Sequence, residues 1–261
     1  MLTGFTAWQL LALGGLVFLA GVVDALAGGG GLITLPAYLA AGLNPTLLLG
    51  TNKLSSALGT IASAVGYLRR LRFPLRPFLP VAAAALCGAA VGARLALHLN
   101  PASIRYLLLA ALPIVTVSVL VRHELGRQDR SAQLGAGVLR RRSCLIASTV
   151  GAYDGFFGPG TGTFFAVALA RWCRHDLLAA TARAKVLNLI TNAAALAVFL
   201  RSGRLDPALG LAMAAASAAG HWLGAHLGLR HSERIIRPAV ALVCAGLFLK
   251  ILYDTLAPHR P

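Results

Sequence analysis

The chain has 261 residues, of which 57% are hydrophobic and 12% are charged, and its mean hydropathy is +0.74. So little polar surface cannot coat a water-soluble globule of this size, which excludes a soluble domain. The net charge of +16 does not indicate a nucleic-acid partner, because the arginines lie in short loops between apolar segments, where they are typical topology signals. The composition predicts a multi-pass protein of a bacterial inner membrane, with the lipid bilayer as its partner.

Apolar segments recur along the chain at lengths that match the roughly 30 Å of hydrocarbon in a bilayer. The segments long enough to span are 7–27, 45–68, 77–99 and 103–121 in the first half, and 176–200, 207–229 and 235–257 in the second. Those that are short are 32–43, 143–157 and 161–173. This pattern predicts an all-α polytopic membrane protein with about 8 spanning helices plus short half-helices. The first segment has no basic region or cleavage pattern, so we expect it to be retained.

The second half of the chain resembles the first. A constant shift superposes Asp24 on Asp154 and Thr51 on Thr181, and an Ile-Arg pair at 104–105 later matches the pair at 236–237. Coincidence in a chain rich in Ala, Leu and Gly does not explain acids and prolines kept in order. The pattern predicts two homologous transmembrane repeats, 1–121 and 143–261, joined by a cytoplasmic loop, 122–142. Internal repeats are typical of secondary transporters.

The distribution of positive charge indicates how the repeats are oriented. The loop 69–76 is rich in arginine, whereas its counterpart, 201–206, has two arginines. The loop 230–237 carries more positive charge than its own counterpart, 100–105. Because positive loops stay in the cytoplasm, the swap favours inverted repeats with both chain ends outside.

Each half interrupts an apolar segment with glycines that follow an acid. Residues 24–36 read DALAGGGGLITLP, and residues 153–165 read YDGFFGPGTGTFF. Consecutive glycines unwind a membrane helix and expose backbone N–H groups, each of which costs several kcal/mol in hydrocarbon unless it finds a partner. A short helix that starts at Leu32 would direct its N-terminal amides at the break, an arrangement suited to an anion. Close helix packing is the alternative explanation, and it suits Gly88, Gly92, Gly220 and Gly224.

The segment after each break carries polar and cationic residues within an apolar stretch. Thr181, Lys185, Asn188 and Asn192 are spaced so that they share one helical face, and Asn52, Ser55, Ser56, Gly59 and Ser63 form a similar stripe in the first half. Intramembrane charges usually mark a substrate or ion route, although residues 53 and 183 lie close enough to a segment end to reach the lipid headgroups instead. The candidate substrate-binding residues are Gly28, Gly29, Gly30, Gly31, Thr51, Asn52, Lys53, Gly158, Gly160, Thr161, Thr181, Arg183, Lys185, Asn188 and Asn192.

The remaining titratable residues suggest fewer roles. Asp24 and Asp154 are candidates to carry protons, to pair with the cations or to cap the following helix. His221 and His226 are five residues apart and have no acid nearby in the sequence, so we expect them at helix interfaces and not on a metal. The dispersed cysteines, which are Cys87, Cys144, Cys173 and Cys244, are expected to be small buried hydrophobes. No metal, cofactor or catalytic residue is expected.

These features favour a secondary transporter for small anions. In this interpretation the two breaks meet near the bilayer midplane, amides and hydroxyls hold an oxyanion, and Lys53, Arg183 and Lys185 balance its charge. One repeat would rock against the other around that site. An anion channel is the alternative. An intramembrane enzyme is less favoured, because the sequence has no G-x-S-x-G, H-E-x-x-H or paired carboxylates at catalytic spacing.

Several of these stretches carry a family resemblance. Residues 22–70, 153–170, 180–192 and 235–254 together resemble the TauE/SafE family of sulfite and organosulfonate exporters, and in particular its YfcA-like branch. The resemblance covers nearly the whole chain. It implies an inner-membrane permease for small anions such as sulfite or sulfoacetate, driven by the proton gradient. The second half has Gly-Pro-Gly-Thr-Gly where many members have a glycine run, so the resemblance does not identify the transported anion. Whether the protein forms a homo-oligomer is also left open by the sequence.

Overall fold

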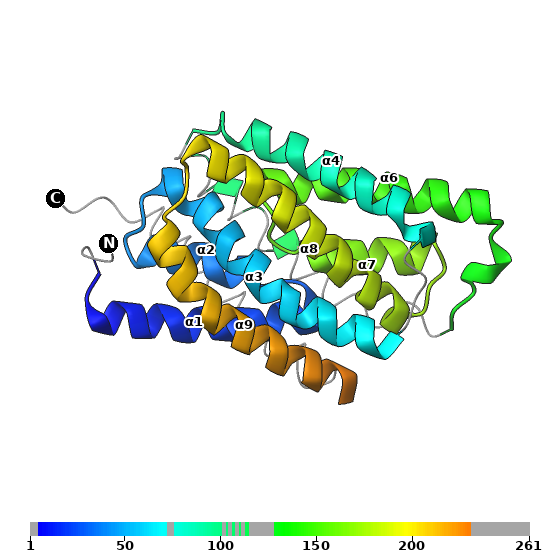
Figure 1. Cartoon of the computed structure of the whole chain (residues 1–261), viewed down its shortest axis with the longest axis horizontal. Coiled ribbons are helices and arrows are strands. Elements are labelled where there is room, and N and C mark those ends of the chain that lie inside the picture. The colour runs from blue at the N-terminus through cyan, green and yellow to red at the C-terminus, as the bar shows by residue number, and fades with distance from the viewer. Residues whose placement is uncertain are drawn as a thin grey trace.

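The computed structural model describes residues 5–71, 76–100, 128–230 and six single positions, 103, 106, 107, 110, 113 and 114. Within these residues the chain is all helical, with eight α-helices and two 3-10 turns (Figure 1). The α-helices are α1 (Ala7–Ala27), α2 (Gly31–Ala40), α3 (Pro45–Leu71), α4 (Leu79–Ala96), α6 (Ala136–Phe156), α7 (Thr161–Trp172), α8 (Leu177–Ser202) and α9 (Pro207–Arg230). The 3-10 turns are η1 (Arg76–Phe78) and η3 (Ser131–Gln133).

Four stretches of the described chain are long and apolar enough to span a membrane: Ala7–Ala27, Arg76–Ala96, Leu177–Ser202 and Pro207–Gly228. The predicted spans 235–257 and, apart from isolated positions, 103–121 lie outside the described residues, as do Cys244 and most of the loops 100–105, 122–127 and 230–237. The two breaks fall where the glycines predict them, between α1 and α2 and between α6 and α7.

The clearest difference from the predicted elements is at the start of α6. This helix begins at Ala136, well before residue 143, and so includes three arginines at 140–142. Hydropathy falls at these arginines, but arginine is a good helix former and does not end a helix. Arg142 also donates a hydrogen bond of 2.7 Å to the carbonyl of Trp172 at the end of α7, which favours the longer helix.

Small residues bring pairs of helices into backbone contact. Gly88 and Gly92 on α4 lie against the backbones of Ser148 and Ala152 on α6. On the other side of the bundle, Gly220 and Gly224 on α9 lie against the backbones of Phe18 and Val22 on α1. The packing role predicted for these four glycines is therefore confirmed, since any side chain here would meet backbone atoms.

These contacts fix the relative directions of the helices. In each pair the residue numbers rise together, so α4 runs parallel to α6, and α1 runs parallel to α9. By contrast Gly50 at the start of α3 lies against Phe199 near the end of α8, so these two helices are antiparallel. In Figure 1, α3 and α8 lie between the α1–α9 pair and the α4–α6 pair.

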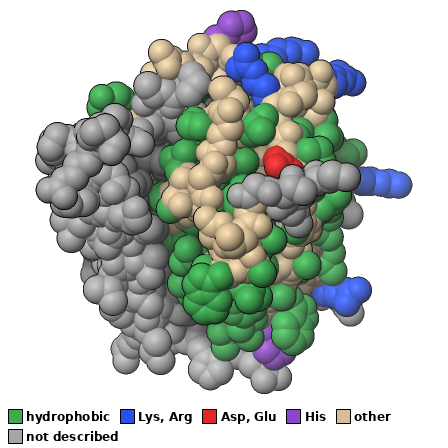
Figure 2. All heavy atoms as spheres, turned by 90° about the vertical axis from the view of Figure 1, so that its left-hand side faces the viewer, with side chains coloured by type: hydrophobic (Ala, Val, Ile, Leu, Met, Phe, Trp, Pro, Cys, Tyr) green, Lys and Arg blue, Asp and Glu red, His purple; other side chains and the backbone are tan. Residues whose placement is uncertain are grey.

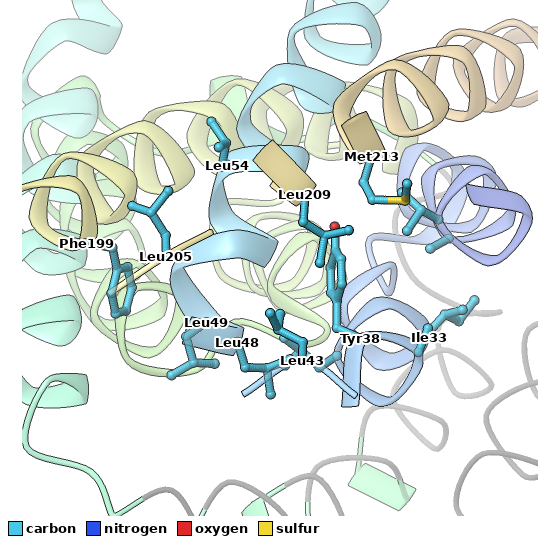
Figure 3. Packing of buried hydrophobic residues seen from close by; sticks show 14 of the residues in the cluster. Ile33, Tyr38, Leu43, Leu48, Leu49, Leu54, Phe199, Leu205, Leu209 and Met213 are labelled. Carbon is cyan, nitrogen blue, oxygen red and sulfur yellow. The ribbon is translucent and has the colours of Figure 1, made fainter. Parts of the chain in front are cut away.

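A buried apolar cluster stabilises the helices of the first break at one end of the bundle. Leu48, Leu49 and Leu54 on α3 pack with residues of α2, α8 and α9 (Figure 3). Tyr38 on α2 is fully buried there and donates its hydroxyl to Ser55 Oγ at 2.9 Å. Figure 2 shows that end of the molecule, where hydrophobic side chains cover much of the described face and the Lys and Arg side chains lie toward its edge.

Candidate ion-pair site at the two helix breaks

The two glycine-rich breaks meet inside the bundle. Gly28 lies against the backbone of Gly162, and the nearest neighbour of Gly31 is Pro159. The hydroxyl of Thr163 donates to the carbonyl of Ala27, which ties the start of α7 to the end of α1. A hydrogen bond between side chain and backbone satisfies one of the carbonyls that the first break exposes.

A small polar cavity lies beside this junction. Its volume is about 30 Å³, enough for one or two water molecules, so a larger solute requires the helices to move apart. The residues that line it are Ala20, Gly21, Asp24, Gly30, Gly31, Thr34, Asn52, Lys53, Ser56, Asp154, Gly158, Asn188, Asn192, Ser217 and His221.

One buried ion pair on the cavity wall joins α3 to α6. Lys53 Nζ lies 2.9 Å from Asp154 Oδ1, and the two side chains are 3% and 2% exposed. The same ammonium donates to Asn192 Oδ1 at 2.8 Å. Among the described residues, Asp154 Oδ2 is the one buried side-chain oxygen or nitrogen atom that lacks a hydrogen-bond partner. An unsatisfied buried carboxylate oxygen is costly and marks a position where an additional donor is favoured.

A second ion pair joins α8 to α1. Lys185 Nζ lies 3.2 Å from Asp24 Oδ2 and also donates to the backbone carbonyl of Asp24. His221 Nε2 on α9 lies 3.1 Å from the same Oδ2. The other oxygen, Oδ1, accepts the amide of Gly30 at 3.1 Å. Asp24 therefore holds together α1, the start of α2, α8 and α9.

The two pairs cross between the halves of the chain. The acid of the first half, Asp24, pairs with the lysine of the second half, and Asp154 of the second half pairs with Lys53 of the first. Each half thus supplies one charge to each pair. Lys185 occupies the place relative to Asp24 that Lys53 occupies relative to Asp154, whereas the constant shift that superposes Thr51 on Thr181 matches Lys53 with Arg183.

The threonines among the predicted site residues serve the local backbone. Thr51 donates to the carbonyl of Leu47 at 2.7 Å and accepts the amide of Asp206 at 2.8 Å. Thr161 donates to Gly158 O, and Thr181 donates to Leu177 O. None of these three lines the cavity. A hydroxyl that donates to a carbonyl one helical turn earlier is a common feature of membrane helices and needs no ligand.

The glycine amides are also partly committed within the protein. Gly28 has a left-handed φ of 82° and donates its N–H to Asp24 O at 2.7 Å, while Gly30 donates to the Asp24 carboxylate. Gly30, Gly31 and Gly158 line the cavity, whereas Gly28, Gly29 and Gly160 do not. Fewer backbone amides are therefore unpaired than the sequence predicts, because Asp24 accepts hydrogen bonds from two N–H groups of the first break.

Arg183 lies away from the central cavity. It lines a separate cavity of about 490 Å³ with Arg76, Arg140 and His175, at the end of the bundle where α4, α6 and α8 begin. Burial, followed by the charge of Arg183, lowers the pKa of His175, which lies 3.4 Å from Asp129 Oδ2. The pKa of Asp129 is also lowered: burial opposes the shift, and hydrogen bonds from Ser131 and His175 outweigh it. This second cluster is distinct from the central ion pairs.

The sequence interpretation missed one central residue. His221 is 3% exposed and lies at a helix interface as expected, where it contacts Asp24, an acid that is distant in the chain and that the sequence does not place beside it. His226 is exposed and stacks on Trp222, so it does not lie at an interface within the described chain. Of the cysteines, Cys173 is buried as expected, whereas Cys87 is exposed and Cys144 is half-buried. No cluster of metal-ligating side chains occurs within the described residues.

Comparison with known proteins places the chain among membrane transporters. The family model "Sulfite exporter TauE/SafE" matches residues 13–251. The chain is 35% identical over 248 residues to the probable membrane transporter protein YfcA of Escherichia coli K12, covering 94% of this chain and 91% of that protein. It is 34% identical over 237 residues to a probable membrane transporter protein of Haemophilus influenzae, covering 91% and 92%. No solved structure matches the chain. With the crossed ion pairs buried among apolar helices, these matches show that the chain belongs to the TauE/SafE family of membrane transporters.

Proposed function

We propose that this protein is a secondary transporter for small sulfur-containing anions, such as sulfite or an organosulfonate like sulfoacetate, in a bacterial inner membrane. The observation that carries the proposal is the orientation of the asparagines in the central cavity. Asn52 Oδ1 accepts the hydroxyl of Thr34 at 2.5 Å, and Asn188 Oδ1 accepts the amide of Asn192 at 3.4 Å. With both oxygens engaged, the NH2 ends of Asn52 and Asn188 are the ends left to donate.

Two lysines complete the chemistry of an anion site. Lys53 lines the cavity, and Lys185 reaches it through Asp24. Burying two ammonium groups in a membrane protein is costly, so their presence indicates a functional role. Each ammonium is held in place by a carboxylate. An oxyanion that enters competes with that carboxylate for the ammonium. The unpaired Asp154 Oδ2 would accept a hydrogen bond from the O–H of an acidic oxyanion such as hydrogen sulfite.

The helix directions support inverted repeats and alternating access. Helices α1, α3 and α4 correspond in order to α6, α8 and α9, and the antiparallel contact between α3 and its counterpart α8 is the orientation that inverted repeats require. Inverted repeats related about a site at the midplane permit one repeat to rock against the other. We extend this arrangement to the whole repeats, residues 1–121 and 143–261. A proton that is taken up at the site together with the anion would couple transport to the proton gradient.

Uptake into proteoliposomes tests this proposal. Sulfite, thiosulfate, sulfoacetate, sulfate and acetate are supplied with and without an inward proton gradient, and empty liposomes serve as the control. We expect saturable uptake of at least one sulfur anion that the gradient accelerates. Unsaturable flux that follows only the membrane potential indicates the alternative, an anion channel. The absence of uptake for every sulfur anion contradicts the proposal.

A further inference from the structure

We infer that His221, and not either aspartate, carries the proton that accompanies the anion. The inference rests on the proposed anion transport and adds which side chain couples it to protons. It starts from the charges at the junction: Asp24 and Asp154 contribute two negative charges, and Lys53 and Lys185 contribute two positive ones. These four charges cancel. The charge of the site then depends on His221, whose ring is either neutral or positive.

Both ring nitrogens of His221 lie beside hydrogen-bond acceptors. Its Nε2 lies 3.1 Å from Asp24 Oδ2, and its Nδ1 lies 2.9 Å from the carbonyl oxygen of Ser217. A carboxylate and a carbonyl are both hydrogen-bond acceptors, so making both bonds requires an N–H on both ring nitrogens. Ser217 Oγ, 3.4 Å from Nδ1, can donate only if Nδ1 has lost its proton. The site therefore has partners for both protonation states.

The charged groups near His221 come from several helices. On α1 it faces Asp24, and Lys185 of α8 approaches the same carboxylate oxygen. On α3 the ring lies beside Gly59, whose missing side chain leaves room for it, and the Lys53–Asp154 pair lies on the wall of the same cavity. On α9 itself the contacts are with Ser217. Within the described chain, the charged groups around the imidazole in the cavity are those of these two ion pairs.

Charge balance then couples the proton to the anion. When a proton binds the imidazole, a new N–H bond forms and the site gains one positive charge. An uncompensated charge inside a membrane costs several kcal/mol, so a monovalent anion is favoured in the cavity at the same time. When the anion leaves, the extra charge is again unfavourable and the proton is released. The expected ratio is one proton for each monovalent anion.

Proteoliposomes containing a pH-sensitive dye measure that ratio. We expect entry of a monovalent organosulfonate, which carries no proton of its own at neutral pH, to acidify the lumen through the wild-type protein, and His221→Gln to carry it, at whatever rate, without that acidification. His226→Gln removes an exposed histidine from the same helix and should keep the wild-type ratio. An unchanged ratio of protons to organosulfonate in His221→Gln overturns the inference.

A second measurement does not depend on transport. Nitrogen NMR of histidine-labelled protein identifies His221 as the signal that is missing from His221→Gln. Across a pH series, we expect both ring nitrogens to carry protons at the acidic end and only one of them at the alkaline end. A ring that stays in one protonation state across the series overturns the inference, even if His221→Gln proves inactive. If no anion is carried by the wild type but the ring titrates, the proposed function fails while the titration of His221 stands.

Discussion

Replacing Lys53 with methionine is expected to abolish anion transport and to lower the free energy of unfolding by about 3–5 kcal/mol, since it leaves Asp154 buried without its partner. Methionine fills a similar volume, so lost packing contributes little. Thermal unfolding in detergent measures the stability, and sulfite flux measures the activity. A Lys53→Met protein that transports sulfite normally contradicts the role given to this ion pair.

The double variant Lys53→Met with Asp154→Asn separates stability from transport. Removing both charges eliminates the unpaired carboxylate, so most of the lost stability should return while transport stays absent. Arg201→Met is the matched control, because Arg201 is an exposed cation near the end of α8 and its loss should change neither property. If the double variant regains transport, the ion pair is structural.

Substitution of Gly28 by alanine is expected to be the most damaging change at the helix break. Gly28 has a φ of 82°, and a side chain there would meet the backbone of Gly162. A left-handed conformation costs an alanine about 1–2 kcal/mol, and the contact would in addition push the two breaks apart. We expect a clear fall in thermal stability and loss of flux, measured by unfolding in detergent and by proteoliposome uptake.

Gly29→Ala is the matched control for that prediction. A side chain at Gly29 meets only Leu32 and Val23 at 3.7 Å or more, which is ordinary van der Waals contact. Its effect on stability should stay within about 1 kcal/mol. Equal behaviour of the two variants would mean that the breaks do not pack as closely as the structure indicates.

Much of the fold follows from local patterns in the sequence. The first helix, Ala7–Ala27, matches the predicted segment, and the glycine runs mark both breaks. These features depend on hydropathy and backbone preference, which a single sequence displays. The start of α6 was misplaced because arginines at 140–142 lower the hydropathy without ending the helix.

The site was less predictable because its contacts connect distant segments. The spacing of Lys185, Asn188 and Asn192 identified one face of α8, but nothing local indicates that Lys185 reaches Asp24. His221 was overlooked for the same reason, since its acidic partner lies at the other end of the described chain. Thr51 and Thr181 do not line the cavity, and each donates its hydroxyl to its own helix, a contact that the sequence does not distinguish from one with a ligand.

The position of a bound anion tests the central claim most directly. Selenite resembles sulfite in charge and shape, and the anomalous scattering of selenium locates it in crystals of the protein. We predict that selenium lies between the two helix breaks, with the selenite oxygens within hydrogen-bonding distance of Lys53 and the NH2 groups of Asn52 and Asn188. Selenium found only in the arginine-lined cavity beside Arg183, with the central ion pairs undisturbed, would contradict the account.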